Sequence, residues 1–285
     1  MKNRLITNLL LATLVITLGL VTWLKPGQEI SNDRRITSQD MGAINTIRIE
    51  RESAETLVLK QENKQWQITK PFSAPALPGK IERLLKISQI KPPVSYPLNI
   101  NELEAFGLRS PTARIIFNGE ALSIGQTESV HSRRYVSNIQ QLFLLDDTFL
   151  HHLTAPVDTY IDTRLLPDNI QITGLQTPNI TLHSDENNIW HHKQNPSLDT
   201  SSDAVHMLLD EWRFARAIHV KYQPEKITGE DVTIHLSDNK KFSFTLIRQK
   251  DDIILISSDS KLAYTLSQTK YKKMTTLPNL DTNDA

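Results

Sequence analysis

The stretch "ENKQWQITKP", residues 62–71, reads as the end of a turn, a tryptophan and a strand that stops at a proline. The stretch "ENNIWHHKQNP", residues 186–196, begins with the same Glu-Asn pair, and its tryptophan follows at the same distance. A constant offset of 124 residues therefore places Trp66 on Trp190. Each tryptophan is large enough to fill the angle between a sheet and a helix. The echo predicts that the chain builds one sheet-and-helix arrangement twice.

The same offset aligns an amphipathic helix in each copy. Apolar residues at i, i+3 and i+4 form the inner stripe of such a helix. The first helix is expected to begin near Pro78, a favoured first-turn residue. The second is expected to begin near Thr200, whose hydroxyl can cap it. The aligned apolar positions are Ile81 with Val205, Leu84 with Leu208 and Leu85 with Leu209.

Strand patterns surround both helices. "INTIRIER" and "TLVLK" precede the first helix, and "NIQITGL" and "NITLHS" precede the second. "ARIIFNGEALSIG" predicts a hairpin that turns at Asn118-Gly119, and "VTIHLSDNKKFSFTLI" predicts one that turns near Asp238-Asn239. Each copy is thus expected to hold two strands, a helix and about four more strands. The predicted fold class is α+β, with two similar modules that each pack a mostly antiparallel sheet against one main amphipathic helix.

One detail of the two copies does not align. Leu57 and Leu59 alternate in one phase before Trp66, whereas Ile180 and Leu182 alternate in the other phase. Either a shifted turn or chance similarity between two α+β modules explains the difference. With the repeat as the guide, the chain divides into a transmembrane anchor (1–25), a linker (26–42), a first module (43–157), a second module (158–280) and a disordered tail (281–285).

Residues 5–24, "LITNLLLATLVITLGLVTWL", carry no charge. As a helix they would span ~30 Å, about the thickness of a bilayer core. The alternative is a cleaved signal peptide, but this apolar run is long for one and lacks a small-x-small cleavage site. Lys2 and Arg4 precede the run, so the positive-inside rule leaves the N-terminus in the cytoplasm. We expect a single-pass inner-membrane protein with the bulk of the chain in the periplasm.

Composition narrows the classes of function. The chain has 285 residues, and its 32 Lys and Arg balance its 32 Asp and Glu, so the basic excess of nucleic-acid binders is missing. It has no cysteine, which excludes disulfides, thiolate metal sites and cysteine nucleophiles. It also has no glycine-rich phosphate-binding motif. We expect no nucleic-acid partner and no cofactor.

Histidine is the remaining source of a metal site. The adjacent pairs His151-His152 and His191-His192 do not chelate naturally, because neighbouring side chains on a strand point to opposite faces. His183 and His191 could meet across a hairpin, and His235 could approach from another strand. No zincin spacing occurs, and we expect surface or half-buried histidines rather than a metal site.

Catalytic residues are not predicted either. The group Ser201, Ser202, Asp203 and His206 lies at a helix start, where serine and aspartate first serve as caps. Four acids, Asp146, Asp147, Asp162 and Asp168, could suggest glycoside cleavage, but each sits beside a turn signal, where aspartate is common.

Several short motifs resemble those of a family of unassigned function, the domain of unknown function 4340. They are Trp66 with Pro71, "GKIERLLKI" (79–87), "FGLRSP" (106–111), "LSIGQ" (122–126), "RRYV" (133–136) and "DTRLLP" (162–167). The resemblance covers about residues 60–170 well and the second copy loosely. It implies a single-pass membrane protein with an extracytoplasmic α/β domain. More weakly, it implies association with auxiliary components of ABC-type transporters.

The motif residues have structural interpretations. Gly107 suits a turn with positive φ, and Pro111 fixes the start of the next strand. Gly125 ends a strand, Arg133 and Arg134 are expected on a solvated edge, and Phe106 stands where the family often has tyrosine. The structural motif residues singled out in both copies are Trp66, Pro71, Leu84, Leu85, Gly107, Pro111, Gly125, Tyr135, Trp190, Leu208 and Leu209.

Together these patterns predict a non-enzymatic accessory protein of an envelope assembly, attached to the membrane by residues 5–24 and bound to protein partners. One alternative is an envelope hydrolase with an unrecognised site between the two modules. Another is a soluble secreted binding protein, which would require cleavage of the N-terminal segment.

Overall fold

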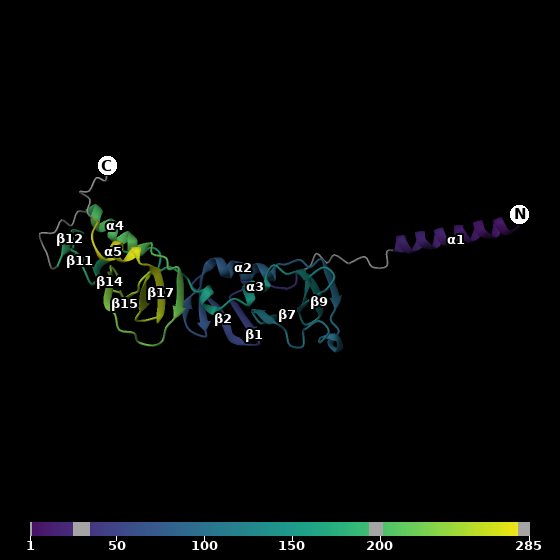
Figure 1. Cartoon of the computed structure of the whole chain (residues 1–285), viewed down its shortest axis with the longest axis horizontal. Helices are drawn as coiled ribbons and strands as arrows, with labels where there is room; N and C mark the ends of the chain where they lie inside the picture. Colours follow the sequence, from purple (N-terminus) through teal and green to yellow (C-terminus); the bar gives the residue numbers. More distant parts are fainter. Residues whose placement is uncertain (1, 25–34, 194–201, 279–285) are drawn as a thin grey trace.

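The computed structural model describes residues 2–24, 35–193 and 202–278. Residue 25 of the expected anchor, residues 26–34 of the expected linker, the expected helix start at Thr200 and the expected tail 281–285 lie outside the described residues. The described chain forms two antiparallel sheets with few helices, which confirms an α+β fold with two strand-rich modules. Figure 1 shows the modules one after the other along the long axis.

The first module is a nine-stranded sheet in the order β4-β3-β2-β1-β6-β7-β8-β9-β5. Its strands are β1 (Thr46–Arg51), β2 (Ala54–Glu62), β3 (Gln65–Lys70), β4 (Ala74–Pro75), β5 (Val94–Pro97), β6 (Ala113–Phe117), β7 (Glu120–Thr127), β8 (Arg133–Ser137) and β9 (Gln141–Asp146). Its helices are α2 (Pro78–Ser88) and α3 (Leu150–Leu153), with short 3-10 turns η1 (Met41–Ala43), η2 (Ile100–Glu102) and η3 (Val157–Tyr160).

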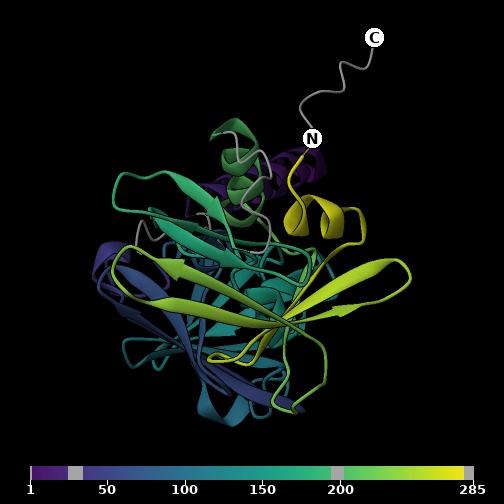
Figure 2. The ribbon, with the colours of Figure 1, turned by 90° about the vertical axis from the view of Figure 1, so that its left-hand side faces the viewer.

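The second module is an eight-stranded sheet in the order β12-β11-β10-β14-β15-β16-β17-β13. Its strands are β10 (Ile172–Gln176), β11 (Thr181–Ser184), β12 (Trp190–His192), β13 (His219–Tyr222), β14 (Glu230–Leu236), β15 (Lys241–Arg248), β16 (Asp252–Ser257) and β17 (Leu262–Ser267). Its helices are α4 (Ser202–Arg213) and α5 (Thr269–Thr275), which lie on the same side of the sheet (Figure 2).

The two sheets have the same strand order. When the two-residue strand β4 is left out, the first three strands of each module lie side by side in reverse order, β3-β2-β1 and β12-β11-β10. The last four strands of the module follow them, and the strand that comes directly after the main helix, β5 or β13, lies at the far edge. Each main helix therefore leaves one edge of its sheet and leads to the opposite edge, so the chain crosses one face and covers it. The strand expected at Trp66 and ending at Pro71 is β3, but the pattern of two strands, a helix and about four strands did not include β4, β5, β12 and β13. These four strands have two to four residues and lie at sheet edges, where alternation is weakest.

The apolar residues before Trp66 and before Trp190 alternate in different phases because the two hairpin turns differ in length. Gln61 lies opposite Trp66, five residues on, but Ser184 lies opposite Trp190, six residues on. The first hairpin uses a two-residue turn in which both residues have positive φ. The second uses a longer loop in which Asp185 Oδ1 accepts two backbone N–H groups. The extra residue moves the preceding strand by one position, and the buried residues of each strand still face the core.

The expected linker is partly packed on the first module. Ile36 is buried, and its N–H donates to the Ile90 carbonyl at 3.0 Å. The Thr37 hydroxyl donates to the Ser88 carbonyl at 2.9 Å, and the Ser38 hydroxyl donates to the Glu120 carboxylate at 2.7 Å. Residues 36–38 are thus fixed against α2 and β7 and belong to the first module.

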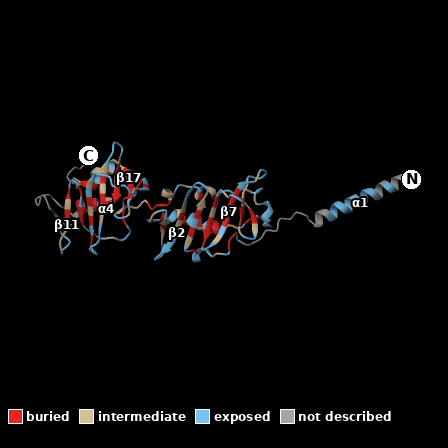
Figure 3. Cartoon of the chain, turned by 90° about the horizontal axis from the view of Figure 1, so that it is seen from below, coloured by how far each residue is buried: buried red, intermediate tan, exposed pale blue. Residues whose placement is uncertain are grey.

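The N-terminal helix α1 runs Lys2–Leu24. Its side chains are described at residue 6 and at residues 10–20, where the large apolar ones are exposed (Figure 3). Within the residues that the structure describes, no helix is both long enough and apolar enough to cross a membrane.

One apolar core continues through both modules. The inner stripe of α2 and that of α4 are buried against their sheets, as the helix periodicity predicts. Trp66 and Trp190 pack against this core but are only partly buried. Among the tryptophans whose side chains are described, Trp212 at the end of α4 is the fully buried one, and its indole N–H donates to the Met274 carbonyl of α5 at 2.8 Å.

Candidate interaction site at the module junction

A segment of extended chain between the modules pairs with both of them. Ile161 forms an antiparallel bridge with Ala76 beside β4, and Arg164 forms one with Arg216 just before β13. Because backbone groups on both sides are hydrogen-bonded, the segment acts as a short shared strand. Accompanying bonds of 2.7–3.1 Å run from Leu77 N–H to Tyr160 O, Asp162 N–H to Pro75 O, Leu165 N–H to Ala215 O and Ala217 N–H to Thr163 O.

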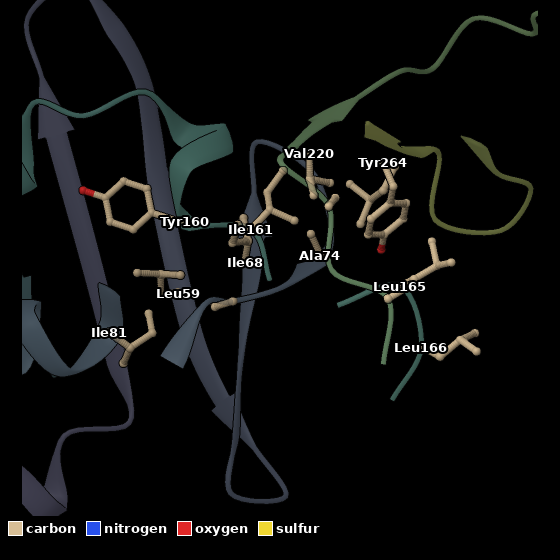
Figure 4. Packing of buried hydrophobic residues seen from close by; sticks show 14 of the residues in the cluster. Leu59, Ile68, Ala74, Ile81, Tyr160, Ile161, Leu165, Leu166, Val220 and Tyr264 are labelled. Atoms are coloured by element: carbon tan, nitrogen blue, oxygen red, sulfur yellow. The ribbon is translucent and has the colours of Figure 1, made fainter. Parts of the chain in front are cut away.

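Apolar side chains fill the junction. Ile161, Leu165 and Leu166 are buried and belong to the continuous core. Figure 4 shows Ile161 next to Ile68 of β3, with Val220 of β13 on its other side. Each fully buried aliphatic side chain stabilises the packed arrangement by about 1.5–3 kcal/mol relative to exposure. Separation of the modules would therefore expose several such side chains at once.

An ion pair with a buried carboxylate and a partly exposed guanidinium closes the junction. Asp162 is 4% exposed, and its Oδ2 accepts from Arg164 Nε at 2.8 Å and Nη2 at 2.5 Å. The second oxygen of Asp162 accepts the backbone N–H of Arg164 at 3.0 Å, and Arg164 also pairs with Asp168. The hydrogen bond to Asp162 is the main cause that raises the pKa of Arg164. Burial, assisted by the charge of Asp162, raises the pKa of Tyr264 to about 12.

Two further contacts lie at the rim of the junction. The rings of Phe72 and Tyr222 stack with centroids 4.6 Å apart and planes 9° apart. His219 Nε2 lies 3.4 Å from Asp158 Oδ2, and within the described residues the buried Asp158 Oδ1 has no hydrogen-bond partner. Sequence patterns did not single out these residues. Arg164 and Asp162 belong to the motif "DTRLLP". The sequence indicated this motif as part of a family resemblance and did not indicate that it connects the two modules.

The predicted motif residues on helices and hairpins are dispersed through the core. Leu84, Leu208 and Leu209 are buried on α2 and α4, whereas Leu85 is half-buried. Trp66 and Trp190 occupy β3 and β12, at or next to one edge of each sheet. Pro71 directly follows β3 and is preceded by a cis peptide bond.

The remaining predicted motif residues lie in the turn that precedes β6 or on the nearby strands β7 and β8, and Gly125 lies inside β7 rather than at its end as expected. Gly107 has φ +66°, as expected for its turn. A methyl group on Gly125 would overlap the Phe106 carbonyl oxygen, so this position is restricted by a close backbone approach. Tyr135 packs against the Phe106 ring with centroids 4.8 Å apart. Pro111 lines an open depression of about 240 Å³ together with Glu50, Arg51, Glu52, Ser110 and Arg114.

The expectation that Arg134 lies on a solvated edge is wrong. Arg134 is buried, and its guanidinium donates to Asp147 Oδ2 at 2.7 Å, to the Gly125 carbonyl at 2.6 Å and to the Thr127 hydroxyl at 3.0 Å. A planar guanidinium can be buried when several donors are satisfied in this way. Adjacent arginines on a strand point to opposite faces, and only Arg133 is left at the surface side.

The four acidic candidates form ion pairs with arginines. Asp146 pairs with Arg133 at 3.5 Å and Asp147 with Arg134, while Asp162 and Asp168 share Arg164. His206 is exposed on α4, and Ser201 lies outside the described residues. Each of the four aspartates is thus paired with an arginine.

The histidines behave partly as the sequence predicts. His183 lies opposite His191 in the β11–β12 hairpin, with ring centroids 5.5 Å apart, and His235 lies on β14 beside Gly174. Across the described ranges 2–24, 35–193 and 202–278, no group of three or more His, Asp or Glu is arranged to hold a metal ion.

No family model matches this sequence, and neither a curated protein nor a solved structure is similar to it.

Proposed function

We propose that this chain is a membrane-anchored, non-enzymatic accessory protein whose two modules form a stiff extracytoplasmic body for binding partner proteins of an envelope assembly. The junction carries this proposal: the segment 161–165 pairs with both sheets, and its side chains complete a common core. A continuous core keeps surfaces on the two modules at a constant spacing. Such spacing serves a docking protein.

The same junction favours binding over hydrolysis. A hydrolytic site between modules needs polar groups that can reach a substrate. Here the described junction is filled by apolar side chains, and its central acid is closed by Arg164 on both carboxylate oxygens. Its exposed rim offers an aromatic stack and an Asp–His pair, which are contacts suited to holding the modules together.

We propose that the two modules arose by internal duplication. Support comes from their common strand order and from the tryptophan hairpin that precedes the main helix in both. The link to ABC-type transport is part of the proposal too. It rests on the motifs that resemble the domain of unknown function 4340, of which "DTRLLP" forms the junction itself.

Membrane attachment through residues 5–24 is proposed from the length of α1 and its surface. Its 23 residues span ~34 Å at 1.5 Å each, and its described large apolar side chains are exposed. Residue 35 follows Leu24 by only eleven positions, so the first module stays within about 40 Å of the end of α1. The full chain should stay in the membrane pellet after alkaline carbonate extraction. Recovery in the supernatant would contradict the anchor.

The accessory role is tested by crosslinking the tagged full chain at its native level, extracting it in mild detergent and identifying what co-purifies. The matched control is the same tag on residues 1–34 alone, which keeps the anchor and removes both modules. A reproducible set of transport or envelope subunits that requires the modules is the expected result. Recovery of the chain alone under the same crosslinking would contradict the proposal.

A further inference from the structure

A row of histidines crosses the outer face of the second sheet. His191 of β12 lies directly opposite His183 of β11, which lies opposite Gly174 of β10, which in turn lies opposite His235 of β14. Directly opposed residues in antiparallel strands project to the same face. The three histidines are exposed, whereas the other face of these strands is buried in the core with α4.

The spacing of the first two rings fits a shared ligand. Two imidazole nitrogens bound to one zinc ion each lie about 2.0–2.1 Å from it, which places two ring centroids roughly 5 Å apart at a tetrahedral angle. The centroids of His183 and His191 are 5.5 Å apart, with an angle of 33° between their planes. The hairpin therefore holds the two rings close to a chelating separation without a backbone change.

Asp185 fixes the tautomer of one ring. His191 Nε2 lies 3.0 Å from Asp185 Oδ2, and an ionised carboxylate only accepts hydrogen bonds, so Nε2 carries the proton. The lone pair of a neutral His191 is then on Nδ1. Asp185 is itself held by the N–H groups of Asn187 and Ile189, both at 2.9 Å.

Gly174 leaves room for a third ring. A Cβ atom there would lie only 3.3 Å from both Cβ and Cδ2 of His235, so the His235 imidazole leans over the glycine toward the column of His183. Three residues of this row thus place imidazole groups along one strip of the sheet, with a gap where a larger side chain would separate them.

We propose that His183 and His191 bind one borderline divalent transition-metal ion, such as Zn²⁺, Ni²⁺ or Cu²⁺, with Asp185 as the positioning residue for His191. His235, whose ring already lies over Gly174, joins as a further ligand when its side chain turns toward His183, and water completes the coordination. Imidazole ligands suit these ions rather than Mg²⁺ or Ca²⁺. A carboxylate that orients a metal-bound histidine is a common arrangement. With two or three ligands on an open face, binding should be weaker than in a closed four-ligand zinc site.

The test is calorimetric titration of the full chain in detergent, without a histidine tag, against ZnCl₂, NiCl₂ and MgCl₂ near neutral pH. We expect one Zn²⁺ or Ni²⁺ per chain and no binding of Mg²⁺. His183→Gln and His191→Gln should each abolish most of the binding. Asp185→Asn should weaken it by about ten-fold, as for other groups that orient metal ligands. His235→Gln should weaken it less than either hairpin variant.

His206→Gln is the matched control, because His206 is exposed on α4, away from the row, and this variant should bind like the unmodified chain. Circular dichroism of each variant checks that the sheet is intact. Equal binding by the unmodified chain and the His183→Gln/His191→Gln double variant would overturn the proposal. So would loss of binding in His206→Gln, or the same response to MgCl₂ as to ZnCl₂.

Discussion

At the scale of single residues, Gly125 shows how a backbone approach restricts a position to glycine. Its φ is not in the left-handed region, so conformational freedom is not the reason. The reason is the Phe106 carbonyl, which lies where a Cβ would be and accepts the N–H of Gln126 at 3.0 Å. The Gly125 carbonyl in turn accepts from the buried Arg134. The turn before β6 and strand β7 are thus held together through one small residue.

We expect Gly125→Ala to destabilise the first module by at least about 2 kcal/mol, because backbone rather than a flexible side chain must move. Gly79→Ala is the matched control. Gly79 lies in the first turn of α2 with nothing within 4 Å of an added Cβ, and alanine favours a helix, so the change should be neutral or stabilising by up to about 1 kcal/mol. Urea unfolding of both variants measures the difference. Equal stability of the two variants would contradict the described approach.

We expect the folded protein to lose stability at high pH because of the buried Tyr264. Its pKa is raised from 10.0 to about 12 by burial first and by the charge of Asp162 second. A pKa raised above the unfolded value gives stability that is complete below about pH 10 and is lost as the pH rises toward 12. Two pKa units correspond to about 2.7 kcal/mol. Tyr264→Phe keeps the ring and should remove this loss.

Unfolding midpoints at pH 8 and pH 11 measure the effect of Tyr264→Phe. Some loss should persist in the variant, because burial also raises the pKa of Tyr160 to about 12. A loss as large as in the unmodified chain would argue against a buried neutral phenol at position 264.

At the scale of elements, the junction segment depends on the ion pair between Asp162 and Arg164, whose carboxylate is buried by tertiary packing. Arg164→Ala leaves Asp162 buried without its guanidinium partner, and we expect destabilisation by about 3 kcal/mol. Asp162→Asn in the same chain should recover part of this loss, because it removes the uncompensated charge. The control is Arg133→Ala, whose partner Asp146 is mostly exposed, with an expected effect below about 1 kcal/mol.

Urea unfolding of the unmodified chain, Arg164→Ala, Asp162→Asn and the double variant gives the coupling energy between Asp162 and Arg164. Asp162→Asn alone should also bring the pKa of Tyr264 closer to its ordinary value, as followed by the absorbance of the phenolate. If Arg164→Ala costs no more than Arg133→Ala, the pair does not hold the junction.

At the scale of the whole molecule, the modules are joined head to tail. The β4 side of the first sheet meets the β13 side of the second through the shared segment. The other edges of the two sheets are formed by β5, the counterpart of β13, and by β12, the counterpart of β3. The first copy therefore contributes its β3–β4 edge to the junction, whereas the second copy contributes its opposite edge, β13.

A continuous core predicts one inter-module distance. The chain has no cysteine, so Ala121→Cys on β7 and Asp231→Cys on β14, both at exposed positions, accept one spin label each. Pulsed electron paramagnetic resonance should give a single narrow distance distribution. Adding Arg164→Ala should broaden it. A broad distribution in the otherwise unmodified chain would mean that the modules move independently and would remove the basis for a stiff docking body.

The sequence by itself determined the α+β class, the two-module organisation and the main helices. These depend on local periodicity, and the stripes of α2 and α4 are visible in a window of eleven or twelve residues. The hairpin at Asn118-Gly119 was equally local, because both residues have the positive φ that their turn requires. The meeting of His183 and His191 followed from strand pairing alone.

Only the tertiary structure decided what lies between the modules. Asp162 and Arg164 resemble any charged turn in sequence, and their burial depends on residues 75–77 and 215–217, which are distant in the chain. Arg134 was misplaced for the same reason, since its partners Asp147, Gly125 and Thr127 come together only when β7, β8 and the end of β9 pack. Short-range patterns record which face a side chain takes. They do not record which distant segment of backbone packs over that side chain. At this junction, such packing joins the two similar modules.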